Sequence, residues 1–255
     1  MVKLRRVQFI LGLFLAIILI LGLCGCMGTI LKQEEKAVLE YLENKYSEEF
    51  VVESLSRDYA IGKPNKAYVH PVGREHEWFM VSIYERDGVR EYSDGYSFVF
   101  ASQAVLPEYE SWVVEAIPGA KIVVNVCNGT KRTREKHDRN ASFDEFAEKE
   151  SHNIGIDINI FLDEKELKNK ENLFEQLSHS LYDNVPRKDI VTETQVIFIK
   201  SDIFNTLVPH SYRGSGAYEM LHYDKIAVAY TRLIVSEGIT QEEILKRLEL
   251  DFEES

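Results

Sequence analysis

The sequence is poor in the residue patterns that mark catalytic and cofactor sites. Its seven histidines are scattered, and no two stand four apart, the spacing with which one helix offers two ligands to zinc. Arg213–Gly216 (RGSG) is not the Gly-x-Ser-x-Gly elbow of a serine nucleophile. It also lacks the preceding strand and following helix of a phosphate-binding loop. We therefore expect no catalytic residue, no metal ion and no cofactor.

Positive charge is scarce as well. The chain of 255 residues carries 30 Lys and Arg against 42 Asp and Glu, a net charge of −12. Such an acidic body argues against nucleic acid as a partner, which requires a basic surface, and against lying flat on anionic lipid. The one basic cluster, Lys131–Arg139, would suit an anionic wall polymer or a protein partner, although a solvated loop explains it as well.

One long apolar run is present, at the start of the chain. Val7–Leu23 follows Lys3, Arg5 and Arg6, which is the pattern of a secretory signal. As a helix it would be about 25 Å long, the lower limit for a hydrocarbon core of about 30 Å. It is thus either a cleaved signal or a retained single-pass anchor. In both cases the basic residues keep the N-terminus inside and send the body outside.

The end of that run resembles a known processing signal. Leu23-Cys24-Gly25-Cys26 is similar to the lipobox of bacterial lipoproteins, with an apolar residue three positions before the modified cysteine and a small residue directly before it. The resemblance covers residues 1–26 only, and Cys24 is an untypical residue at its position. It implies a signal peptide over 1–25, lipidation of Cys26 and a tether over 26–32. The body would then be lipid-anchored at the outer face of the cell membrane, because two or three acyl chains hold firmly.

Processing would change the composition of the body. Removing 25 residues leaves 230 and takes the net charge to −15, because the lost segment carries three basic and no acidic residues. Cys127 would be the one remaining thiol, so no intramolecular disulfide is expected and the core must supply the stability. Cys127 ends an apolar run and is interpreted as a small buried residue. The basic residues Lys131, Arg132 and Arg134 leave a reactive thiol as the alternative.

The segment 33–106 predicts a helix followed by an antiparallel meander. Apolar residues recur at helical spacing within 33–49, and Asp87-Gly88 suits a two-residue hairpin turn. Asp94-Gly95 repeats the hairpin signal. The expected strands span 50–57, 67–72 and 78–85.

The segment 107–255 predicts a second α+β portion with mixed strands and helices. We place its start after residue 106, with Pro107 in the first turn of a helix that ends at Pro118-Gly119. Ser142 with Glu145, and Thr240 with Glu243, form capping boxes that open two further helices. The expected strands span 120–126, 154–162, 191–200 and 226–235, and residues 218–235 are alternatively helical. The fold class is α+β.

The strand 154–162 alternates strictly. Its isoleucines point to one face, and Asp157 and Asn159 point to the other. With Asp163 nearby, these residues would suit calcium or a pair of acids for glycosidic cleavage. A solvated strand face is the simpler interpretation.

Together these patterns favour a membrane-anchored extracytoplasmic lipoprotein that binds or scaffolds an unknown protein or wall component without catalysis. An extracytoplasmic hydrolase acting on a cell-wall or peptide substrate is the first alternative. The second is a single-pass protein with the same body, held by Val7–Leu23 in place of a lipid on Cys26.

Overall fold

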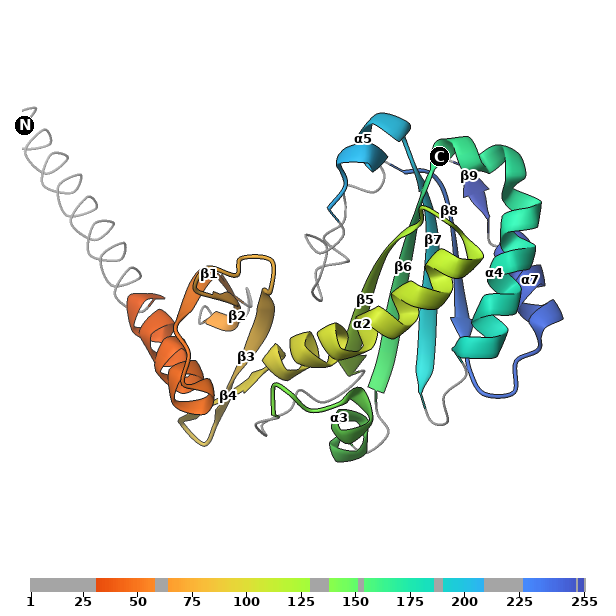
Figure 1. Ribbon diagram of the computed structural model, residues 1–255. Helices are drawn as coiled ribbons and strands as arrows, with labels where there is room; N and C mark the ends of the chain where they lie inside the picture. The colour runs from red at the N-terminus through yellow and green to blue at the C-terminus, as the bar shows by residue number, and fades with distance from the viewer. Residues whose placement is uncertain are drawn as a thin grey trace, which may run out of the picture. The chain divides into compact units, whose positions relative to one another are not determined.

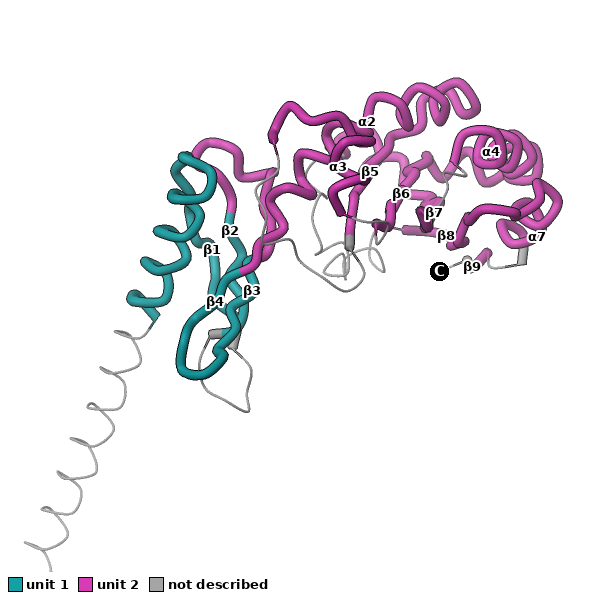
Figure 2. Tube along the Cα trace, turned by 90° about the horizontal axis from the view of Figure 1, so that it is seen from below, with its two compact units in different colours: residues 1–69, 81–92 teal, residues 70–80, 93–255 magenta. Residues whose placement is uncertain are grey.

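The computed structural model describes residues 31–57, 64–128, 138–150, 154–185, 190–208, 227–250 and 252–254. These residues form an α+β fold with two sheets, as the sequence predicts. The chain divides into two compact units. Unit 1 comprises Met1–Val69 and Val81–Tyr92, and unit 2 comprises His70–Met80 and Ser93–Ser255 (Figure 2).

The helix and meander predicted for the first part of the chain are confirmed. A helix over 31–46 precedes an antiparallel four-stranded sheet with the order β1-β2-β3-β4 (Figure 1). Asp87 and Gly88 have φ angles of 53° and 77°, as the predicted two-residue hairpin requires. The strands are β1 (Phe50–Arg57), β2 (Pro64–Pro71), β3 (Phe79–Arg86) and β4 (Val89–Asp94).

The buried face of the helix over 31–46 includes a carboxylate. Val38 and Leu42 are fully buried, and Glu34, one turn earlier on the same face, is only 7% exposed. Glu34 forms a 3.0 Å ion pair with Arg90 and accepts a 3.1 Å hydrogen bond from the Tyr92 hydroxyl. Burial, with the adjacent Glu34, raises the pKa of Tyr92 to about 12. These contacts fix the first turns of the helix to β4.

Two sequence-based expectations around residue 100 are wrong. Asp94-Gly95 does not form a hairpin: Asp94 ends β4, its carboxylate accepts the backbone N–H of Tyr96 at 3.1 Å, and Gly95 is the N-cap of helix α2 (Tyr96–Ala116). The helix expected to start at Pro107 therefore starts eleven residues earlier and crosses the position after residue 106. Pro107 lies inside α2, on its exposed side.

Unit 2 contains a mixed sheet with the order β5-β6-β7-β8-β9. β6 and β7 are parallel and the other pairs are antiparallel. The parallel pair follows from the helical crossover between them. Residues 227–235 are a strand, so the helical alternative is wrong there. The strands are β5 (Lys121–Asn128), β6 (Ile154–Asp163), β7 (Val191–Ile199), β8 (Ala227–Val235) and β9 (Glu253–Glu254).

β5 lies at one end of this strand order, and α2 contributes to its outer edge. The Oγ of Ser102 on α2 accepts the backbone N–H of Val126 at 2.8 Å and donates to the carbonyl of Phe98 at 2.7 Å. A backbone donor of the edge strand is therefore bonded within the unit.

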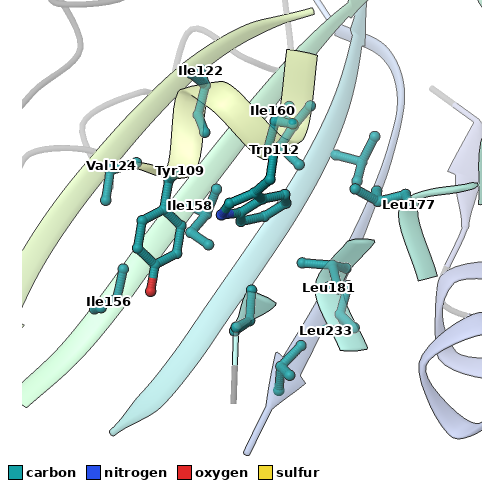
Figure 3. Packing of buried hydrophobic residues seen from close by; sticks show 14 of the residues in the cluster. Tyr109, Trp112, Ile122, Val124, Ile156, Ile158, Ile160, Leu177, Leu181 and Leu233 are labelled. Carbon is teal, nitrogen blue, oxygen red and sulfur yellow. The ribbon is translucent and has the colours of Figure 1, made fainter. Parts of the chain in front are cut away.

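Helices cover one face of the mixed sheet. Side chains from α2, α4 and α7 share one core with the inward side chains of β5–β8 (Figures 1 and 3), and Ile158 and Leu177 are fully buried in it. The predicted capping boxes are confirmed at Ser142–Glu145 and Thr240–Glu243. The helical segments are α3 (Phe143–Lys149), η1 (Glu164–Asn169), α4 (Lys170–Asn184), α5 (Ser201–Thr206) and α7 (Gln241–Leu250).

Candidate functional site

The face of the mixed sheet opposite α2, α4 and α7 has a polar half and an apolar half. We call the polar half the polar face; it comprises Cys127, Asp157, Asn159, Glu193, Gln195 and Arg232. The strand register places Asp157 beside Glu193, Asn159 beside Gln195, and Gln195 beside Arg232. Because side chains alternate along each strand, all six project from the same side of the sheet.

The apolar half of this face is closed by α5. Val123, Phe161, Ile197 and Ile199 are buried there under α5 and Leu207. Lys121 fixes the end of α5, because its ammonium donates to the carbonyls of Phe204 at 2.6 Å and Leu207 at 2.9 Å. The polar face begins where this apolar cluster ends.

A thiol and a carboxyl group meet on the polar face. Cys127 and Asp157 are hydrogen-bonded through their side chains. Burial, followed by the proximity of Asp157, raises the pKa of the Cys127 thiol to about 12. Burial and the charge of Glu193 raise the pKa of Asp157 to about 6. Near neutral pH the thiol is therefore protonated and donates to the carboxylate, so Cys127 does not have the character of a nucleophile.

Glu193 has a cationic partner on the neighbouring strand, β8. Arg232 forms a 2.6 Å ion pair with one carboxylate oxygen of Glu193, and the Gln195 amide donates to the other at 3.0 Å. The two neighbouring acids thus differ: Asp157 is half-buried beside a thiol, whereas Glu193 has a guanidinium partner.

Apolar side chains border the polar face toward solvent. Val191, Tyr230 and Ile234 lie on the same side of the sheet and are 52%, 39% and 47% exposed. Exposed Tyr and Ile beside a paired Arg and uncharged amides have the composition of a protein interface. Chemically, the arrangement can donate and accept hydrogen bonds and offer apolar contact.

A second ionic cluster in unit 2 surrounds Glu77, which is only 5% exposed. Its carboxylate pairs with Arg74 at 3.0 Å and Arg139 at 3.8 Å and accepts the Gln103 amide at 3.0 Å. Arg74 also donates to the Tyr96 hydroxyl at 3.0 Å. Because the carboxylate is satisfied on both oxygens, we interpret this cluster as a clamp that holds residues 74–77 and 139 against α2.

Several sequence-based candidates lie outside the described residues. These are Cys26 with the whole segment 1–30, the basic residues 131–137 and the loop 209–217. Arg139 of the basic cluster is described, and its guanidinium lies on the Phe100 ring and near Glu77. Within the described ranges no helix is long and apolar enough to cross a bilayer.

Histidines and acids of the described part do not assemble a metal site. No group of three or more His, Cys, Asp or Glu side chains there is arranged to hold an ion. His70 is buried, and its Nδ1 lies 3.0 Å from the carbonyl of Pro71. Asp163, considered with Asp157 and Asn159, instead caps η1 by accepting the N–H of Lys165 at 3.0 Å.

Sequence reasoning identified Asp157, Asn159 and Cys127 but missed Glu193 and Arg232. The alternation of β7 and β8 places both on an outward face, which was a usable signal. Their proximity to Asp157 could not be predicted from the sequence, because it depends on the strand order and on the parallel register of β6 with β7.

The polar face belongs to a fold that is also found in a solved structure. No family model and no curated protein matches the chain. The fold is similar to the crystal structure of a DUF5037 family protein from Ruminococcus gnavus ATCC 29149, with a TM-score of 0.50 and 14% sequence identity. The similarity covers 85% of this chain and 99% of that chain. At this identity the likeness concerns the fold alone.

Proposed function

We propose that the protein is an exported, membrane-anchored binding module that presents the polar face of its mixed sheet to a protein partner. The anchor is a lipid on Cys26, at the outer face of the cell membrane. The spacing of Leu23, Gly25 and Cys26 supports this anchor. The basic residues before the apolar run support the outward orientation of the body.

The observation that carries the binding role is the mixture of side chains around the polar face. Tyr230 and Ile234 are half exposed beside the Glu193–Arg232 ion pair. Aromatic residues and Arg are enriched in protein interfaces relative to the rest of the surface. The bonded thiol of Cys127 supports recognition over covalent chemistry, because a thiol with a pKa of about 12 is not ionised at neutral pH.

Metabolic labelling tests the anchor. Labelled palmitate should enter the wild-type protein and the Cys127→Ala variant but not Cys26→Ala. Unchanged labelling of Cys26→Ala would refute lipidation at this residue. The mass of the mature protein separates the alternatives, because an anchor made by Val7–Leu23 keeps the first 25 residues and a lipoprotein loses them.

Photo-crosslinking in intact cells tests the face. A photoreactive amino acid in place of Tyr230 should give a discrete adduct, which Ile234→Asp should abolish. Tyr182 on α4 is 45% exposed and provides a control position away from this face. Equal adducts at both positions, or an adduct that is insensitive to Ile234→Asp, would exclude the polar face as the binding surface.

One observation favours an extracytoplasmic hydrolase as a second candidate. Asp157 and Glu193 are neighbouring acids with unlike environments, and the pKa of Asp157 is raised to about 6. Such a difference is how a general acid and its partner carboxylate are separated. Cell-wall or peptide substrate turnover that is lost in both Asp157→Asn and Glu193→Gln would support this function. Turnover that survives either change would exclude the pair.

A further inference from the structure

Unit 2 contains a group of buried polar atoms in its helix-covered core. Thr192, Thr194 and Thr231 are 1%, 0% and 0% exposed, and Trp112 on α2 is 6% exposed. Their three hydroxyls and the indole Nε1 are fully buried, and among the described residues none of these four atoms has a hydrogen-bond partner. Buried polar groups in native proteins are nearly always hydrogen-bonded to protein or to ordered water.

The strand register gathers the three threonines. Thr194 lies beside Ile158 of β6 and opposite Leu233 of β8, and Thr192 precedes it by two residues on the same face. Thr231 lies opposite Val196, so it is the diagonal neighbour of Thr194 across β7 and β8. All three threonines therefore lie on the helix-covered face of the sheet, with Thr194 between Thr192 and Thr231.

Trp112 approaches the same area from above. Figure 3 shows its indole beside Ile158 and Ile160 and facing the side chains of Leu177 and Leu181. Ile158 is the direct neighbour of Thr194 in the parallel pair. The indole donor and the threonine hydroxyls thus share the layer between the sheet and helices α2 and α4.

The chemistry of these four groups defines what they bind. Threonine hydroxyls donate and accept, the indole only donates, and none carries a charge. Valine has the same shape as threonine and would fill each position without a polar atom, yet the sequence has a hydroxyl at three adjoining sites. Internal water typically makes about three hydrogen bonds to such buried polar groups.

We propose that unit 2 has an internal hydration site in which ordered water is bound by Thr192, Thr194, Thr231 and the indole N–H of Trp112. The site is independent of the polar face, which lies on the opposite side of the sheet. Its ligand is neutral and as small as water, because the surrounding positions are close-packed apolar side chains.

Nuclear magnetic resonance of the full chain in detergent tests the site. The indole proton of Trp112, assigned by its loss in Trp112→Phe, should show cross-relaxation with long-lived water. The signal should disappear in the double variant Thr194→Val/Thr231→Val. Absence of the signal in the wild type overturns the proposal.

Thermal unfolding of the threonine variants provides a second readout. The change in Tm has one sign if water bridges the hydroxyls and the opposite sign if the hydroxyls are dry and unbonded. With bridging water, Thr194→Val and Thr231→Val should each lower Tm by about 2–4 °C, and their combination should cost less than the sum because they share one ligand. A rise in Tm in either variant would mean dry, unbonded hydroxyls and overturns the proposal, even if relayed magnetisation reaches Trp112. Thr206→Val is the matched control, since this exposed hydroxyl donates to the Ile203 carbonyl.

Discussion

The Sγ of Cys127 lies 3.0 Å from the position that a Cβ would occupy at Gly155. The two residues are direct partners in the antiparallel pair of β5 and β6. The thiol therefore occupies the space above the glycine, and from there it reaches the carboxyl group of Asp157. The φ of Gly155 lies outside the left-handed region, so this contact with the sulfur, and not backbone strain, is what disfavours a larger residue there.

Gly155→Ala should destabilise the protein by about 1–3 kcal/mol, because the new methyl group overpacks against the thiol. Cys127→Ala should relieve the clash, so the double variant should be more stable than the sum of the two single effects predicts. Urea unfolding of all four proteins measures the coupling. Strictly additive effects would show that the methyl group and the sulfur do not compete for the same space.

Asp157→Asn should stabilise the protein at neutral pH. The pKa of Asp157 is about 6 in the fold against 3.8 in the unfolded chain, so the folded state binds the proton more tightly. The contribution of this group to stability is complete below pH 4 and is lost as the pH rises to 6. A shift of about two units corresponds to about 2–3 kcal/mol. The gain in Asp157→Asn should therefore be full above pH 7 and vanish toward pH 4.

Urea unfolding across this pH range measures that difference. The asparagine amide oxygen still accepts the Cys127 thiol, so the geometry is preserved. Asp163→Asn is an informative control, because the hydrogen bond from Lys165 and that from Ser201 lower the pKa of Asp163. Its effect should have the opposite sign and should fade on acidification. A pH-independent difference for Asp157→Asn would contradict the assigned shift.

Glu77→Gln should destabilise unit 2 by about 2 kcal/mol. The change leaves the guanidinium of Arg74 without its charged acceptor in a largely buried setting and weakens the contact of Arg139. Trp78 adjoins the clamp, so its fluorescence reports the unfolding. In the control Lys36→Gln, loss of the exposed Lys36–Glu40 pair should cost about 0.5 kcal/mol or less. Equal losses of unfolding free energy in the two variants would show that the Glu77 cluster stabilises the protein no more than an exposed ion pair does.

Pro107→Ala should stabilise α2. Proline in a helix interior removes a backbone hydrogen bond and costs up to about 3 kcal/mol relative to alanine, and Pro107 is on the exposed side of α2, where alanine is readily accommodated. We expect a gain of about 1 kcal/mol, visible as a higher Tm by circular dichroism. A lower Tm would show that packing beneath α2 depends on a bend that the proline maintains.

The elements of this fold were largely predictable, because their signals are local. The alternation of 154–162, the Asp87-Gly88 turn and the Ser142–Glu145 capping box each act within a few residues, and each is confirmed. The Asp94-Gly95 error arose because Asp94 accepts the N–H of Tyr96 and a helix follows in place of a hairpin. The Pro107 error arose where tertiary packing overrides a local signal. Pro107 is accommodated because the helix buries Val105 and Tyr109 on its other side.

The candidate site was predictable only in part. Asp157 was expected on the outward face of its strand, but no short-range pattern links it to Cys127, thirty residues earlier, or to Glu193. Those contacts depend on two sheet registers, one of them parallel, and on the desolvation that follows. The burial of Glu34 could not be predicted for the same reason, since its partners Arg90 and Tyr92 come from a strand that is distant in the sequence.

The bond from Val126 to Ser102 bears on how the protein behaves among its neighbours. An edge strand with free backbone donors is a template on which another chain can add a strand, and such additions can propagate into fibrils. At Val126 that donor is already used by a hydroxyl of α2. In the membrane-anchored form proposed above, the chain would share a thin layer with its neighbours and meet them frequently. A single serine thus makes this position of the sheet a poor starting point for edge-to-edge polymerisation.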